Sequence, residues 1–178
     1  MDNRSDIWRG VDAIKPRFIE LSDRVWAMPE VCYTEARSSA EHLAELRHQG
    51  FRITEQVAGI PTAMIGEWGE GGPVIAFLGE YDALPGLSQE ANVAEPRPME
   101  AGGHGHGCGH NLLGSAALLA ATSVKDWLAV QQKPDACAIT AVPPRKAAPR
   151  RPSWCVPGPS MMSTSPSPGT PTVSGRWR

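Results

Sequence analysis

An α/β fold is predicted for the first 133 residues, because segments with helical periodicity and apolar strand-like runs share this part of the chain. Apolar residues recur every three or four positions over 5–28 and again over 35–49. Apolar runs at 62–68 and 74–78 have the length and composition of strands. The two kinds of element together predict helices packed against a sheet.

The first helix is expected to begin at Ser5 or Asp6, whose side-chain oxygens can accept hydrogen bonds from the free amide groups of the first turn. It is expected to end before Pro29. Trp8 and Trp26 are predicted to be core residues rather than parts of a binding site. The face predicted to pack into the core consists of Ile7, Val11, Ile14, Phe18, Leu21 and Val25.

The second helix is predicted from an apolar stripe formed by Ala40, Leu43 and Leu46. Gly50 follows at the position where a left-handed residue commonly ends a helix. Residues 51–54 then begin a strand, because phenylalanine, isoleucine and threonine are frequent in strands.

The runs at 62–68 and 74–78 are predicted to pair as a hairpin, because the segment 69–73 between them is rich in glycine and proline. The second run is expected to be a buried strand that leads into an acidic loop. A third helix is predicted for 112–130, and its first two turns are almost wholly apolar. This helix is therefore expected to lie against the sheet, which would hold its N-terminal end rigidly.

A segment rich in glycine and histidine, 102–114, leads into the third helix and carries candidate metal ligands. Cys108 and His110 are two positions apart, so both side chains can point at one ion if the segment is extended. The positive N-terminal end of the helix favours a thiolate over a thiol. These residues supply two of the four ligands that a zinc site normally uses, so a flexible loop without a ligand is an equal alternative on this evidence.

Two motifs together resemble the signatures of a known family. They are GEYDALPGLSQ at 79–89 and GHGCGHNLLG at 105–114. The family is that of metal-dependent amidohydrolases and peptidases, which includes aminoacylases, indole-acetyl-amino-acid hydrolases and p-aminobenzoyl-glutamate hydrolases. The resemblance implies that residues 1–133 form the N-terminal part of a metallopeptidase-like α/β catalytic domain, roughly the first third of the family's fold.

The resemblance also implies roles for individual residues. In that family the cysteine and histidine of the CGH motif bind a centre of two divalent metals, zinc or manganese, which indicates Cys108 and His110 as ligands here. The aspartate of the DALP motif lies beside the metals, so Asp82 is expected to orient a ligand. His106 is a candidate for contact with metal or substrate, and the alternative is a solvated loop imidazole. The implied reaction is hydrolysis of the amide bond of a small N-acyl or N-aroyl amino acid.

Composition excludes several classes of partner. The chain has 178 residues and a formal net charge of -2, with an isoelectric point near 6.2, which argues against binding to nucleic acid or to a membrane surface. No signal peptide is predicted, and no stretch is expected to reach membrane-spanning length. The four cysteines show no disulfide framework, which predicts a cytoplasmic location. Cys32 is expected to be a packed thiol.

Residues 134–178 differ from the rest of the chain. They hold ten of the seventeen prolines and six basic residues, but one acidic residue, Asp135. This Pro/Ser/Arg-rich composition is typical of a disordered tail. A shift of reading frame near 131–134 would explain it, because a shifted reading of 141–171 with permitted synonymous codons contains EEGG and WHP motifs like those of the family.

The missing motifs determine the expected activity. In the family the first glutamate of EEGG acts as general base, while the second glutamate and the histidine of WHP are metal ligands. Neither motif is present in the translated chain, so no catalytic residue is assigned. We therefore predict an inactive N-terminal fragment of an amidohydrolase. The alternative is a small non-catalytic metal-binding or interaction module.

Overall fold

The computed structural model of the protein describes residues 3–132 and 136–141. This part of the chain contains three α-helices, one short 3-10 helix and four strands. Their order is α1 (Asn3–Trp26), α2 (Ala36–His48), β1 (Arg52–Glu55), η1 (Val57–Gly59), β2 (Met64–Trp68), β3 (Val74–Gly79), α3 (His110–Val130) and β4 (Ala136–Ala141).

The strands form one mixed sheet in the order β1-β2-β4-β3. β2 is antiparallel to β1 and to β4, whereas β3 and β4 are parallel. Parallel neighbours require a long connection, and α3 provides it. The predicted hairpin between 62–68 and 74–78 is wrong, because β4 lies between the two strands and pairs with both.

β4 also corrects the prediction of a disordered tail. Its backbone pairs with β2 on one side and with β3 on the other. Ile139 and Thr140 are β-branched, which favours the extended conformation. The tail prediction is therefore wrong for 136–141, and the remainder of 134–178 lies outside the described residues.

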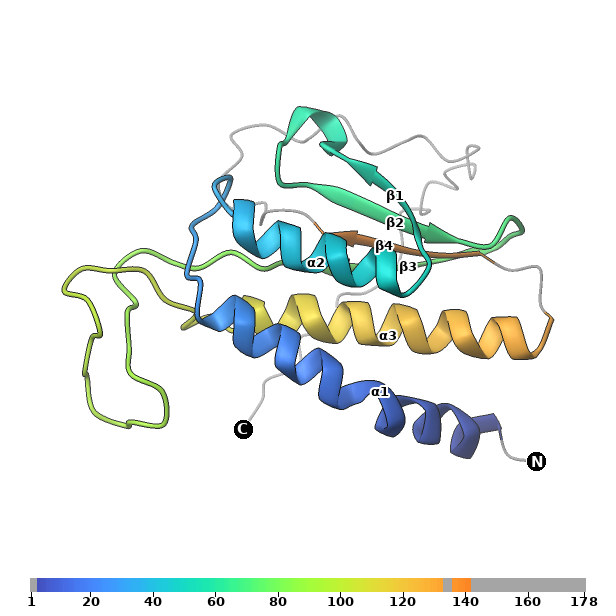
Figure 1. The fold of residues 1–178 in the computed structure, drawn as a ribbon, viewed down its shortest axis with the longest axis horizontal. Coiled ribbons are helices and arrows are strands. Elements are labelled where there is room, and N and C mark those ends of the chain that lie inside the picture. Colours follow the sequence, from blue (N-terminus) through green and yellow to red (C-terminus); the bar gives the residue numbers. More distant parts are fainter. Residues whose placement is uncertain (1–2, 133–135, 142–178) are drawn as a thin grey trace, which may run out of the picture.

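The helices lie on one side of the sheet (Figure 1). α2 and α3 pack against the strands, and α1 packs mainly against α3. The core between these layers is built from Phe18, Leu21, Val25, Leu46, Phe51, Met64, Tyr81, Leu118, Ala121 and Leu128. The C-terminal half of the apolar face predicted for the first helix is thus confirmed.

The N-terminal half of α1 diverges from α3 (Figure 1). As a result Ile7 is 37% exposed and Trp8 is 62% exposed, so the prediction that Trp8 is a core residue is wrong. The helix begins at Asn3, upstream of the predicted cap at Ser5 or Asp6, so that prediction is wrong as well.

α2 ends as its sequence predicts. Gly50 has a φ of 77°, which places it in the left-handed region that favours glycine. Its N–H donates to the Arg47 carbonyl, and the Phe51 N–H donates to the Leu46 carbonyl. These bonds satisfy carbonyl groups that the end of the helix would otherwise leave free.

β3 is more exposed than the sequence predicts. Val74 is 61% exposed, Ile75 is 42% exposed and Leu78 is 64% exposed. The reason is that β3 lies at an edge of the sheet and the helices cover one face of it. Leu112, on the first turn of α3, is also exposed, at 63%.

α3 passes the test of length and composition for a membrane span, contrary to the expectation that no stretch would do so. It is the one helix among the described residues that passes. Its side chains Leu118, Ala121 and Leu128 are nevertheless buried in the core. This burial is the pattern of a helix packed inside a domain.

His42 on α2 gives the fold a predicted sensitivity to acid. The side chain is buried, and its Nδ1–H donates to the Ser38 carbonyl at 2.9 Å. Burial lowers the pKa of His42 to about 4, whereas the unfolded chain has a histidine pKa near 6.5. Between these values the unfolded chain takes up a proton that the folded protein refuses. We therefore expect the free energy of unfolding to fall by up to about 3 kcal/mol as the pH drops from 6.5 to 4.

Urea unfolding at a series of pH values measures this effect. His42→Asn is the control, because its side-chain amide can still donate to the Ser38 carbonyl but does not titrate. The buried Glu35 has a raised pKa, because burial disfavours its charge, so it shifts stability in the opposite direction in both proteins. The difference between the two profiles therefore reports His42 alone, and equal profiles would contradict the prediction.

Candidate metal centre

The acidic residues of the site follow the end of β3. Glu80, Tyr81 and Asp82 continue the chain, and successive side chains in extended backbone point to opposite sides. Tyr81 points into the core, where it is 1% exposed and its hydroxyl donates to the Thr62 carbonyl. Glu80 and Asp82 both contact His110, as the alternation requires.

His110 is the first residue of α3 and lies between the two carboxylates. Its Nδ1 is 2.8 Å from Oδ1 of Asp82, and its Nε2 is 3.2 Å from Oε2 of Glu80. One donor atom from each of the three side chains lies within 4.8 Å of the others. Gly109 precedes the helix with a φ of 77°, a left-handed conformation that glycine adopts without strain.

The charges of this cluster favour a cation. A carboxylate oxygen can only accept, so each ring nitrogen of His110 needs a proton or a metal ion between it and its carboxylate. Asp82 is 1% exposed, and its Oδ2 is buried without a hydrogen-bond partner among the described residues. An isolated buried carboxylate oxygen is unfavourable, and a divalent cation would satisfy it. Imidazole nitrogen and carboxylate oxygen are donors that zinc and manganese accept.

Two glycines allow α3 to approach the end of β3. A Cβ on Gly79 would lie 3.2 Å from the Cα of Gly114. A Cβ on Gly114 would lie 2.6 Å from the backbone oxygen of Glu80 and 2.8 Å from Nε2 of His42. The absence of these side chains is therefore what lets the first turn of α3 bring His110 against the carboxylates.

The structure brings together two of the predicted site residues, His110 and Asp82. Cys108 is exposed and lies outside the group of three donors. Its role as a ligand stays a prediction. Glu80 was missed, although the alternation of acidic residues around Tyr81 is a signal that could have indicated it.

His106 is not the solvated loop imidazole that the sequence left as an alternative. It is 4% exposed, and its Nε2–H donates to the Val25 carbonyl at 3.1 Å. Burial lowers its pKa, so the ring is held neutral. Its Nδ1 is buried without a partner among the described residues, and its ring centroid lies 6.1 Å from that of Trp26. Contact of His106 with metal or substrate stays a prediction.

A buried acid lies behind the centre. Glu35 is fully buried, and the Thr62 hydroxyl donates to it at 2.8 Å. Burial raises the pKa of Glu35, and the negative charge of Asp82 acts in the same direction. Burial and the neighbouring carboxylates, Glu35 first, raise the pKa of Cys32 to about 12. The Cys32 thiol therefore stays protonated at neutral pH, which agrees with the packed thiol predicted from the sequence.

Sequence comparisons connect this centre to known proteins. No family model matches the chain. Over 119 residues the chain is 51% identical to a p-aminobenzoyl-glutamate hydrolase of Escherichia coli K12, a match that covers 66% of this chain and 24% of that protein. This part of the chain belongs to the metal-dependent amidohydrolase and peptidase family. A second match, to Xaa-Arg dipeptidase of Mus musculus, has 31% identity over 125 residues and covers 65% of this chain and 25% of that protein. The chain thus spans about a quarter of the length of these curated relatives.

Solved structures confirm the fold of this amidohydrolase relative. A dinuclear metal binding peptidase of the M20 family from Bacillus subtilis superposes with a TM-score of 0.57 at 22% identity, over 74% of this chain and 36% of that one. A protein from methicillin-resistant Staphylococcus aureus described as an aminohydrolase superposes with a TM-score of 0.62 at 15% identity, over 79% of this chain and 35% of that one. The predicted metallopeptidase-like α/β fold is therefore confirmed.

Proposed function

We propose that this chain carries part of the two-metal centre of an amidohydrolase that cleaves N-acyl or N-aroyl amino acids of the p-aminobenzoyl-glutamate type. The observation that supports the proposal best is the convergence of Glu80, Asp82 and His110 on one point. The named activity of the relative with 51% identity supports the substrate class.

The residues of the centre have distinct roles in this proposal. Glu80, Asp82 and His110 would hold a divalent cation. When bound, such an ion polarises an amide carbonyl and lowers the pKa of water. Asp82 fixes the orientation of the His110 ring through Nδ1. If Cys108 joins the ligands, its soft thiolate favours zinc over manganese.

We further infer that the chain by itself binds a cation but does not hydrolyse substrate. The three donors form one cluster, and a second cation needs further ligands. The glutamate that serves the family as general base belongs to the EEGG motif, which the translated chain lacks. Loss of a general base slows hydrolysis by a factor of about 100 to 10,000.

Isothermal titration with Mn²⁺, Zn²⁺ and Co²⁺ tests the centre. We expect the full chain to bind a cation and His110→Ala to lose that binding. In the same preparations, hydrolysis of p-aminobenzoyl-glutamate should not exceed a buffer blank. Absence of cation binding would refute the proposed centre. Turnover that Cys108→Ala abolishes would refute the inferred inactivity.

A metal-binding module remains the second candidate, because the three donors form a cation site without any contribution from 142–178. Restoring the reading frame near 131–134 separates the two candidates. A fragment of an amidohydrolase gene would then yield a longer protein that hydrolyses p-aminobenzoyl-glutamate. A gene for a module would yield a protein that binds the cation and remains inactive.

A further inference from the structure

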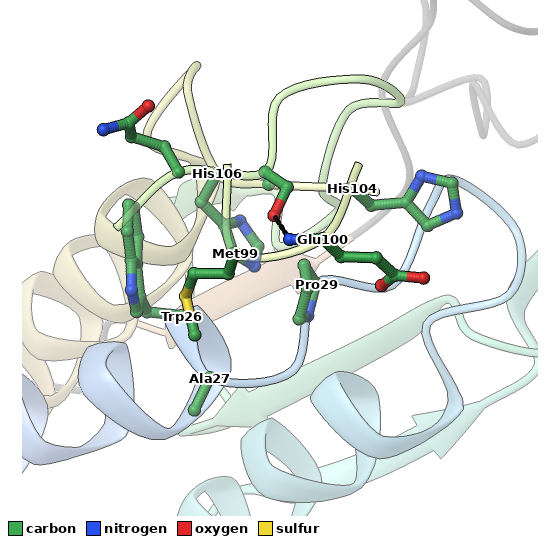
Figure 2. Close-up of a pocket in the computed structure, with 10 residues that line it drawn as sticks. Trp26, Ala27, Pro29, Met99, Glu100, His104 and His106 are labelled. Carbon is green, nitrogen blue, oxygen red and sulfur yellow. Dashed lines mark hydrogen bonds between the residues drawn. The ribbon is translucent and has the colours of Figure 1, made fainter. Parts of the chain in front are cut away.

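A pocket of about 300 Å³ lies next to the candidate metal centre (Figure 2). Three segments line it: the end of α1 with the turn that follows, the loop 88–100, and the histidine-bearing loop 104–106. Its volume is at the lower end of the range for small-molecule sites, so it suits one ring-sized group.

The pocket and the centre share a wall. His106 lines the pocket, and its ring is close enough to Asp82 and His110 to respond to their charges. Gly105, also in the wall, exchanges two backbone hydrogen bonds with Leu84, at 2.9 and 3.0 Å. Leu84 is two residues beyond Asp82 in the chain. A group in the pocket would therefore lie beside the metal ligands.

The two ends of the pocket differ in chemistry. In Figure 2 the side chains of Trp26 and Met99 lie at one end, whereas His104 and the carboxylate of Glu100 lie at the other. The Trp26 indole is half-buried and lies near the His106 ring, with the ring planes tilted by 33°. Flat aromatic walls of this kind favour an aromatic guest, which gains ring-to-ring contacts beyond simple burial.

The loop that closes the pocket is held by its own hydrogen bonds. The Glu100 N–H donates to the Ser88 hydroxyl at 3.1 Å, the bond drawn as a dashed line in Figure 2. The Gln89 side chain accepts from the Arg97 N–H at 2.9 Å and donates to the Glu95 carbonyl at 2.9 Å. A wall fixed in this way loses little conformational freedom when a ligand binds.

We infer that this pocket binds the uncharged aromatic acyl group of an N-aroyl amino acid, with the Trp26 indole as its main wall. The inference rests on the proposed function and names the part of the substrate that this surface selects. An arginine side chain, which the name of the mouse relative suggests for that protein, would place a cation in a pocket whose end near Trp26 is apolar.

The test compares ligands that differ in the acyl group. Binding of N-benzoyl-glutamate and N-acetyl-glutamate to the full chain is measured by saturation-transfer NMR titration. We expect the benzoyl compound to bind about 10-fold more tightly. Trp26→Leu should reduce this preference to about 2-fold or less, and Trp26→Phe should retain most of it because phenylalanine keeps an aromatic face.

Trp8→Leu is the matched control. Trp8 lies on the same helix, is 62% exposed and does not line the pocket, so this variant should keep the full preference for the benzoyl compound. An unchanged preference in Trp26→Leu would overturn the inference, as would tighter binding of glycyl-arginine than of N-benzoyl-glutamate.

The two proposals can fail separately. If His110→Ala abolishes cation binding but Trp26→Leu leaves the acyl preference unchanged, the pocket inference fails and the metal centre stands. If no cation binds but Trp26→Leu still removes the preference for the benzoyl compound, the metal centre fails and the pocket remains a site for the aromatic group.

Discussion

Gly114→Ala should lower the free energy of unfolding by about 2 kcal/mol or more and abolish cation binding in the same variant. The added Cβ would lie 2.6 Å from the backbone oxygen of Glu80 and 2.8 Å from Nε2 of His42. Both contacts are far shorter than packed atoms allow, so the first turn of α3 must move away from the end of β3. His110 is on that turn, so it would separate from the carboxylates of Glu80 and Asp82.

Gly10→Ala is the matched control for this change. Gly10 is also inside a helix, α1, but a Cβ there would meet nothing within 4 Å. Alanine is the better helix former, so we expect this variant to gain up to about 1 kcal/mol of stability and to bind the cation unchanged. Urea unfolding and isothermal titration with Mn²⁺ measure both quantities. If the two variants shift stability in the same direction, the close approach at Gly114 is not the cause.

The sequence predicted those features that depend on neighbours along the chain. The end of α2 at Gly50 is an example, because a left-handed cap is a local property of a few residues. The apolar positions Phe18, Leu21 and Val25 were also predicted correctly, because helical periodicity defines one face without reference to its partner.

The errors involve partners that are distant in the chain. Turn-like residues at 69–73 suggested a hairpin, but the strand that pairs with both neighbours is β4, which follows α3. The burial of His106 depends on a carbonyl at Val25, 81 positions away. Periodicity contains no information about either choice, because both are decided by how helices and strands pack.

The candidate site was predicted in part for the same reason. His110 and Asp82 were identified because each belongs to a motif, and the structure places them 2.8 Å apart. Glu80 belongs to the same motif as Asp82 but was not singled out. Its contribution depends on the extended backbone after β3, which directs both carboxylates toward α3.

Asp82→Asn should reduce affinity for Mn²⁺ and Zn²⁺ about 100-fold or more, while the free energy of unfolding of the metal-free protein changes by no more than about 1 kcal/mol. The substitution keeps the size of the side chain and an oxygen that can accept from His110 Nδ1–H. It removes a negative charge that is 1% exposed and has one oxygen without a partner. The carboxylate therefore contributes to cation binding far more than to the stability of the fold.

Glu45→Gln provides the opposite case. Glu45 is also a buried carboxylate, but it accepts two hydrogen bonds from the Arg17 guanidinium nitrogen, at 2.6 and 2.8 Å, and it lies outside the metal cluster. We expect this variant to lose about 1 kcal/mol of stability and to bind cations unchanged. Titration with Mn²⁺ and urea unfolding in the presence of a chelator measure each variant in both respects. Because the two substitutions should fail in different assays, an equal loss of affinity in Glu45→Gln would show that cation binding follows overall stability and not the Asp82 carboxylate.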